Sequence, residues 1–286
     1  MSEAPPSSAD RRLVDNVRPA DWRNPIPRER YDLVVIGAGT GGLVSAAIGA
    51  ALGARVALVE RRRMGGDCLN FGCVPSKGVL RAARSWAAAR DSHESFGGPE
   101  VSGSGDFAAA MARMREIRSG ISDVDSAERF AGMGVDVFFG EGRFDSKRSV
   151  LVDGHERLEF RRAIIATGTR PAVPGVPGLE DAGFLTNESV FELDRRPERL
   201  LVLGAGPIGC ELSQAFARLG SRVVLLDQEK RILAREEPDA ADLVLHALER
   251  DGVEFIGGAD VTGVEGADGR TVLRYETAGG SGQVEG

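Results

Sequence analysis

A strand–turn–helix–strand pattern occurs twice in this sequence, and the repeat constrains the fold more than any other feature. In the first copy an apolar run leads to a glycine-rich turn at Gly37, and an acid, Glu60, stands 23 residues later. In the second copy the turn begins at Gly204, and Asp227 again stands 23 residues later. The equal spacing predicts two βαβ units, and therefore an α/β protein with parallel sheets.

Both turns match the G-x-G-x-x-G fingerprint of dinucleotide-binding folds. Its glycines allow a tight turn, close approach of backbone to a pyrophosphate, and close helix–strand packing, while the acid accepts hydrogen bonds from a ribose. Glycine-rich turns of an unrelated α/β protein are the alternative. Two sites in one chain indicate two ligands, a tightly held flavin and an exchanging nicotinamide. The expected ligand-binding residues are Gly37, Gly39, Thr40, Gly41, Gly42 and Glu60 in the first copy, and Gly204, Gly206, Gly209 and Asp227 in the second.

Two cysteines, Cys68 and Cys73, follow the first copy and are close enough to bridge when the chain curls. Cys73 stands just before Pro75, where a helix is expected to begin, so the helix macrodipole and unpaired N–H groups should stabilise a thiolate there and lower its pKa. Two ordinary buried cysteines or half of a metal site are the alternatives. No histidine or third cysteine is near enough in sequence to complete a zinc set, so no metal site is expected.

Lys77 lies in the first turns of the same expected helix, where a cation has the wrong sign for the helix dipole. Residues that break a local rule often serve a site. We expect its partner to be Glu211, in the first helical turn after the second fingerprint; a solvated lysine is the alternative.

Charge and cysteine content restrict the class of protein. The net charge of -7 argues against a nucleic-acid partner, because binding to phosphates requires a basic surface. Residues 33–54 carry no charge and are long enough to span a bilayer, but their six glycines and strand–turn–helix pattern argue against a membrane segment. With three cysteines and no signal peptide, the expected compartment is the cytoplasm.

The rest of the chain is assigned to domains as follows. Residues 1–29 are expected to be a flexible lead-in, 30–185 a first domain and 186–286 a second, incomplete domain that ends in a glycine-rich turn without a closing element. Further elements are predicted from the apolar pattern, namely helices at 75–90, 107–131 and 237–250, and strands at 135–139, 149–152, 157–160 and 162–166.

The segment GGDCLNFGCVPSK, the two fingerprints and the strand end at Ala166-Thr167-Gly168 resemble the class I pyridine nucleotide-disulfide oxidoreductases. The resemblance runs from about Tyr31 to the end of the chain and is strongest to mercuric reductases. It implies two Rossmann-like domains, with an NAD(P)-binding domain inserted in an FAD-binding domain. The implied cofactors are FAD and NADH or NADPH.

The resemblance also implies roles for single residues. Cys73 would be the charge-transfer thiol against the flavin, and Cys68 the interchange thiol that meets a disulfide or metal-ion substrate. Glu60, Lys77, Gly142, Thr167 and Gly168 would help to hold FAD. Lys77 and Glu211 would act with the cysteines in catalysis.

This sequence departs from the family pattern at several points. Pro207 replaces a tyrosine that covers the nicotinamide in many relatives, and Asp227 favours NADH, although Lys230 and Arg231 could reach a 2′-phosphate. Relatives are longer homodimers, and the C-terminal dimerisation domain with its His-Glu pair is expected to be missing here. A dihydrolipoyl dehydrogenase-like enzyme and an inactive truncated fragment are therefore the alternatives to a mercuric reductase-like enzyme.

Overall fold

The computed structural model describes residues 7–103, 105–267 and 270–286. The chain divides by its contacts into two compact units. Unit 1 contains the chain up to Pro75 together with Arg113–Arg170, and unit 2 contains Ser76–Ala112 and Pro171–Gly286. The chain therefore passes from unit 1 to unit 2 after residue 170. The domain limits 30–185 and 186–286 remain a prediction from the sequence.

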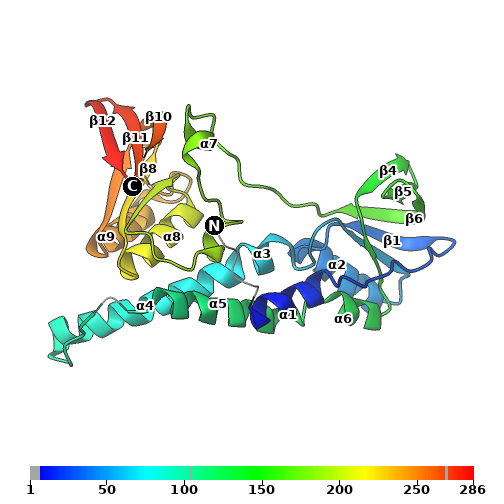
Figure 1. The fold of residues 1–286 in the computed structure, drawn as a ribbon. Coiled ribbons are helices and arrows are strands. Elements are labelled where there is room, and N and C mark those ends of the chain that lie inside the picture. Colours follow the sequence, from blue (N-terminus) through cyan, green and yellow to red (C-terminus); the bar gives the residue numbers. More distant parts are fainter. Residues whose placement is uncertain (1–6, 104, 268–269) are drawn as a thin grey trace. The chain divides into compact units, whose positions relative to one another are not determined.

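Unit 1 is built on a six-stranded sheet of order β3-β2-β1-β6-β5-β4 (Figure 1). β1, β2, β3 and β6 are parallel, and β4 and β5 continue the sheet as antiparallel neighbours of β6. The five residues of β2 are all buried, as expected for a central strand of a covered parallel sheet. The strands are β1 (Tyr31–Ile36), β2 (Val56–Glu60), β3 (Asp136–Phe139), β4 (Gly142–Ser146), β5 (Ser149–Val152) and β6 (Glu156–Ile165).

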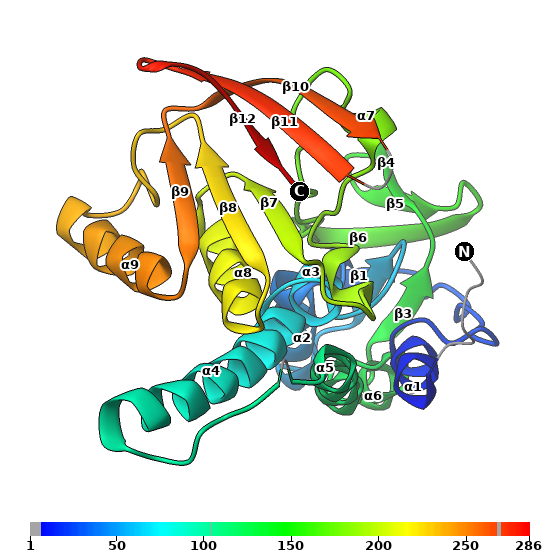
Figure 2. The same cartoon turned by 60° about the vertical axis from the view of Figure 1, so that its left-hand side comes forward.

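Unit 2 contains a parallel sheet of order β7-β8-β9 and an antiparallel sheet of order β10-β11-β12, which Figure 2 shows as two separate groups of strands. Helix α8 (Pro207–Arg218) connects β7 to β8, and α9 (Pro238–Arg250) connects β8 to β9. The strands are β7 (Arg199–Leu203), β8 (Arg222–Asp227), β9 (Val253–Gly257), β10 (Asp260–Ala267), β11 (Arg270–Thr277) and β12 (Gly280–Glu285). The second βαβ unit is therefore confirmed.

The remaining helices are α1 (Ser8–Val17), α2 (Thr40–Ala51), α3 (Gly66–Asn70), α4 (Cys73–Phe96), α5 (Phe107–Ser122), α6 (Ala127–Gly132) and α7 (Leu179–Ala182), with a 3₁₀ turn η1 (Val190–Glu192). Three sequence predictions were wrong in detail. The expected helix 107–131 is interrupted between α5 and α6, where Ser126 caps a new helix. The strands expected at 157–160 and 162–166 are the single strand β6, and the chain ends in β12, which pairs with β11.

The expected flexible lead-in contains the ordered helix α1, so that prediction needs correction. The Ser7 side chain accepts a hydrogen bond from the Asp10 N–H, and the Asp10 side chain accepts one from Ser7, which forms a capping box. Leu13 and Val17 stand four residues apart and are both buried in the core of unit 1. The capping box and this apolar pair on one face of the helix both stabilise α1.

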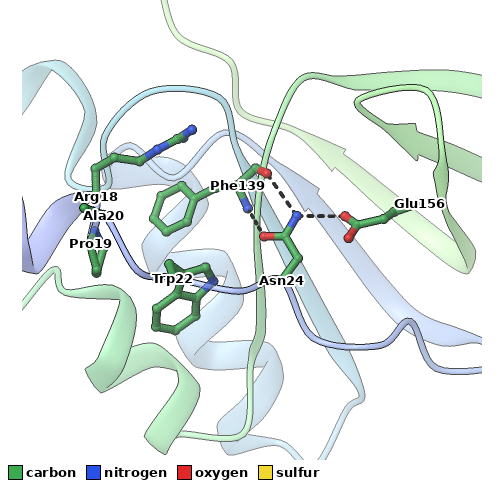
Figure 3. Close-up of a pocket in the computed structure, with 7 residues that line it drawn as sticks. All are labelled: Arg18, Pro19, Ala20, Trp22, Asn24, Phe139 and Glu156. Atoms are coloured by element: carbon green, nitrogen blue, oxygen red, sulfur yellow. Dashed lines mark hydrogen bonds between the residues drawn. The ribbon is translucent and has the colours of Figure 1, made fainter.

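The chain after α1 covers the outer edge of β3, the terminal strand of the sheet (Figure 3). The Asn24 side chain donates to the Phe139 carbonyl at 3.0 Å and accepts from the Phe139 N–H at 2.8 Å. The Trp22 indole N–H donates to the Val137 carbonyl at 3.2 Å. Side chains therefore take the place of a neighbouring strand. A pocket of about 330 Å³ lies here, lined by Arg18, Pro19, Ala20, Trp22, Asn24, Phe139 and Glu156.

Candidate active site

The first glycine-rich turn joins the end of β1 to α2, and its glycines are required by the backbone around them. Gly37 has φ +102°, and a Cβ on it would overlap the Ala166 carbonyl oxygen at the end of β6. A Cβ on Gly42 would overlap the carbonyl oxygen of Gly37, so this glycine lets α2 approach the turn closely. Gly41 has nothing within 4 Å of an added Cβ, so the fold itself does not require a glycine there.

Glu60 ends β2, is 9% exposed, and has both carboxylate oxygens fixed by backbone donors. One oxygen accepts from the Ala38 N–H at 2.8 Å and the other from the Arg62 N–H at 2.6 Å. Burial raises the pKa of Glu60, and the Ala38 N–H and nearby arginines partly oppose the rise. The carboxylate therefore stands beside the phosphate-facing turn, as the fingerprint predicts.

Gly142, Thr167 and Gly168 lie around the same strand ends. A Cβ on Gly142 would lie 3.2 Å from the Val59 side chain, one residue before Glu60. The Cα of Thr167 would lie 3.1 Å from a Cβ on Gly37, and Gly168 has φ +65°. The structure thus brings these three expected residues to the first turn, while their role in holding FAD remains a prediction.

The cysteine segment is joined directly to this turn. The Gly65 N–H donates to the Ala38 carbonyl at 2.9 Å. Gly66 has φ +56°, and a Cβ on it would lie 2.5 Å from the Cα of Gly39, so only glycine allows the two backbones to approach so closely. The Thr40 hydroxyl, at the start of α2, donates to the sulfur of Cys68. The two motifs, separate in the sequence, form one site.

The two redox-candidate sulfurs face each other. Cys68 lies in the short helix α3, and Cys73 is the first residue of α4. Between them, Gly72 makes a tight return in which a Cβ would lie 3.0 Å from the Asp67 carbonyl oxygen. Both cysteines are free thiols here, and Cys68 donates a hydrogen bond to the sulfur of Cys73.

The surroundings of Cys68 raise the pKa of its thiol. Burial raises the pKa of the Cys68 thiol, and its hydrogen bond to Cys73 and the charge on Cys73 raise it further. The Thr40 hydroxyl and the Cys73 N–H oppose this rise. Cys73 is exposed, whereas Cys68 is half-buried.

The second glycine-rich turn repeats the geometry of the first within unit 2. The Ala205 N–H donates to Asp227 at 2.5 Å, as Ala38 donates to Glu60, and the Ala205 carbonyl accepts from the Leu233 N–H at 2.8 Å. Gly204 has φ +104°, and a Cβ on Gly209 would overlap its carbonyl oxygen. Gly206 is the N-cap of α8. Both predicted turns therefore have the dinucleotide-binding arrangement.

The predicted partner of Lys77 is confirmed. Its ammonium nitrogen lies 2.7 Å and 2.6 Å from the two carboxylate oxygens of Glu211, and both residues belong to unit 2. The side chains are 60% and 38% exposed, so the pair is accessible to water. Its catalytic role remains a prediction.

Two polar residues that hold the cysteine turn were missed by the sequence analysis. Asn70 is 1% exposed and stands between the two cysteines, and this position in the motif could have identified it. Arg118 is also buried and lies in α5, where nothing in the sequence distinguishes it from neighbouring arginines. The three histidines are exposed: His93, His155 and His246.

The first turn fits FAD on the evidence of its own residues. The tight glycine cradle at Gly37 and Gly42, the N-terminus of α2 and the fixed Glu60 carboxylate are suited to a pyrophosphate and a ribose. Within the described ranges, no three His, Cys, Asp or Glu side chains are grouped so that they could hold a metal ion. In the same part of the chain, no helix has both the length and the apolar character needed to cross a bilayer.

Comparison with known proteins agrees with this geometry. The family model described as pyridine nucleotide-disulphide oxidoreductase matches residues 31–285. A mercuric reductase of Lysinibacillus sphaericus is 35% identical over 260 residues, covering 91% of this chain and 47% of that protein. A dihydrolipoyl dehydrogenase of Chlamydia muridarum is 35% identical over 254 residues, covering 86% of this chain and 53% of that protein.

Among solved structures, the HOCl-induced flavoprotein disulfide reductase RclA from Escherichia coli is similar, with a TM-score of 0.75 and 29% identity. The match covers 89% of this chain and 54% of RclA. The chain therefore spans about half the length of the relatives it matches. The matched residues include both glycine-rich turns and the cysteine pair, and the chain belongs to the pyridine nucleotide-disulphide oxidoreductase family.

Proposed function

We propose that this protein is a flavin-dependent NAD(P)H oxidoreductase that uses a Cys68–Cys73 disulfide and acts on a metal ion or a disulfide. The observation that carries the proposal is the attachment of the cysteine turn to the first glycine-rich turn, through the Gly65–Ala38 hydrogen bond and the Thr40–Cys68 contact. A sulfur pair held there lies beside the residues that fit FAD.

In the proposed reaction, bound FAD supplies the two-electron chemistry that links nicotinamide and disulfide. Glu60 would accept hydrogen bonds from the ribose of the flavin nucleotide, and the turn of Gly37 would hold its pyrophosphate. The Cys68–Cys73 bond breaks on receiving two electrons. Burial raises the pKa of Cys68, so Cys68 would take up a proton, and the reduced pair would carry one proton and one negative charge.

With a disulfide substrate, the Cys68 sulfur would attack one substrate sulfur and its proton would pass to the departing sulfur, so that the first thiol leaves and a mixed disulfide with Cys68 forms. Cys73 would then attack the sulfur of Cys68, so that the second thiol leaves with a proton from water and the Cys68–Cys73 disulfide is restored. With a metal ion, both sulfurs would bind the cation as Cys68 loses its proton, and the two electrons stored in the pair would pass to the metal as the Cys68–Cys73 bond forms again. The mercuric reductases among the relatives support the metal ion as the first substrate to test.

We propose NADH as the nicotinamide cofactor. The Asp227 carboxylate is held by the Ala205 and Glu229 N–H groups, where it would accept from a ribose hydroxyl and repel a 2′-phosphate. Arg231 donates to the carbonyl oxygens of Ala234 and Glu236, at 3.1 and 3.2 Å. One nitrogen of its guanidinium, Nη2, is therefore engaged with backbone carbonyls, which supports NADH rather than NADPH.

The test begins with the purified protein. A yellow flavin spectrum and NADH oxidation that depends on Hg²⁺ would support the proposal, whereas activity with lipoamide alone would favour a dihydrolipoyl dehydrogenase-like enzyme. A protein that binds no flavin would support the alternative of an inactive chain.

Two serine variants test the roles of the cysteines. After reduction, Cys73→Ser should abolish the long-wavelength absorbance of a thiolate beside flavin, and Cys68→Ser should preserve or increase it. The reverse pattern would exchange the two assignments.

A further inference from the structure

The cysteine turn is bound by a buried cation that belongs to neither dinucleotide motif. The Arg118 side chain is 3% exposed. Its guanidinium donates to the carbonyl oxygen of Asn70, the last residue of α3, at 3.1 Å, and to the Asp10 carboxylate in α1 at 3.3 Å. A buried cation is costly unless it is paired and hydrogen-bonded, so these two partners contribute to keeping it in place.

Asn70 fixes the turn that carries Cys68. Its side-chain amide donates to the carbonyl oxygens of Met64 and Gly66, at 3.0 and 2.8 Å. Those bonds join the beginning and the end of α3, and Arg118 holds the same residue by its backbone carbonyl. Because Cys68 stands two residues before Asn70 in a five-residue helix, movement of Asn70 would move Cys68 as well.

Helix α1 also touches the start of the cysteine segment. The Met64 N–H donates to the Val17 carbonyl at 3.0 Å, and Arg18 donates to the carbonyl oxygens of Arg61 and Arg62. The family match begins at residue 31, so α1 itself lies outside the matched region, whereas the residues that it contacts lie inside it.

We propose that Asp10, Arg118 and Asn70 form a hydrogen-bonded relay, buried at Arg118 and Asn70, through which helix α1 positions the Cys68–Cys73 pair. The three are positioning residues, and the inference rests on the proposed function because it assigns them to the redox pair. Fixing α3 keeps the two sulfurs close, which favours their disulfide over the open dithiol. It also keeps Cys68 half-buried, which slows its reaction with external reagents.

Asp10→Asn and Arg118→Lys break the relay with small changes. The lysine keeps the charge but lacks the fork that reaches both partners. Each variant should shift the equilibrium between protein disulfide and glutathione toward the dithiol by about tenfold, the change expected when one charge-assisted hydrogen bond is lost. Alkylation of Cys68 by iodoacetamide, followed by mass spectrometry, should become faster.

Two control variants separate positioning from a general loss of stability. Arg113→Gln removes an exposed arginine from the same helix, where it pairs with Glu116, and should leave both readouts unchanged. Val150→Ala opens space in the other core cluster of unit 1, and should lower the unfolding midpoint without changing the cysteine equilibrium. Arg118→Lys combined with Asp10→Glu should restore part of the wild-type equilibrium, because the longer acid reaches the shorter cation.

The relay is refuted if Asp10→Asn and Arg118→Lys match the wild type in both readouts, or if Val150→Ala shifts the equilibrium as far as they do. Failure of the proposed function looks different, because the wild-type protein would then form no Cys68–Cys73 disulfide at all.

Discussion

Gly41 and Gly42 are neighbours in the first turn of α2, yet a methyl group would meet different surroundings at each. A Cβ on Gly42 would overlap the carbonyl oxygen of Gly37 and lie 2.9 Å from its carbonyl carbon, whereas no atom lies within 4 Å of a Cβ on Gly41. Gly42→Ala should therefore destabilise the protein, and Gly41→Ala should not.

The change in the free energy of unfolding depends on whether the atoms near the new methyl group can move aside. At position 42 the obstacle is backbone, so α2 must shift away from the turn, and overpacking of this kind costs about 1–3 kcal/mol. At position 41 the methyl group meets no obstacle, and replacing a helical glycine by alanine stabilises by roughly 0.5–1 kcal/mol. Because both glycines lie in α2, the gain from replacing glycine by alanine applies to both variants. The two should therefore differ by the overpacking cost alone, about 1–3 kcal/mol in their free energy of unfolding.

Urea unfolding followed by circular dichroism measures this difference. The midpoint should fall for Gly42→Ala and rise slightly for Gly41→Ala. Gly209→Ala repeats the test in unit 2, where a Cβ would overlap the Gly204 carbonyl oxygen. Equal midpoints for the variants at 41 and 42 would refute the argument that close helix–strand approach demands the third glycine of the fingerprint.

Two further predictions concern Cys210 and the Lys77–Glu211 pair. Burial, with the nearby Asp227 charge, raises the pKa of Cys210 to about 11, so the thiol stays protonated and the folded protein should resist iodoacetamide at this position at about pH 8. Unfolding in urea should make Cys210 reactive, and rapid modification of the folded protein would contradict the prediction. Lys77→Met should change the free energy of unfolding by less than about 1 kcal/mol, because the ion pair is exposed. A larger loss in urea unfolding would show that the pair is a main support of unit 2.

The parts of the site with a strict geometric cause could be predicted from the sequence. The spacing from Gly37 to Glu60 reflects one strand, one helix and one further strand, and the structure closes it with the Ala38–Glu60 hydrogen bond. The same reasoning holds for Gly204 and Asp227. The charge of Lys77 opposes the helix dipole, which predicted an acidic partner, and the predicted partner Glu211 is confirmed.

The missed features depend on contacts that the local sequence does not reveal. Helix α1 buries only Leu13 and Val17 along its length, so its apolar period was too weak to notice, although the Ser7–Asp10 capping box was readable. Arg161 made β6 look like two short strands, because a charged side chain in the middle of the strand separated the two apolar runs. Arg118 is buried, and its hydrogen-bond partners Asn70 and Asp10 both stand more than forty positions away in the chain.

The covering of β3 by Asn24 and Trp22 has a practical consequence for protein production. A shortened chain that starts at Tyr31, where the family match begins, would lose both side chains. The N–H and carbonyl groups of Phe139 and the carbonyl of Val137 would then face water at the border of the sheet. An exposed strand edge can pair with a strand of a second molecule. A chain start chosen from the family match alone would therefore favour self-association and precipitation.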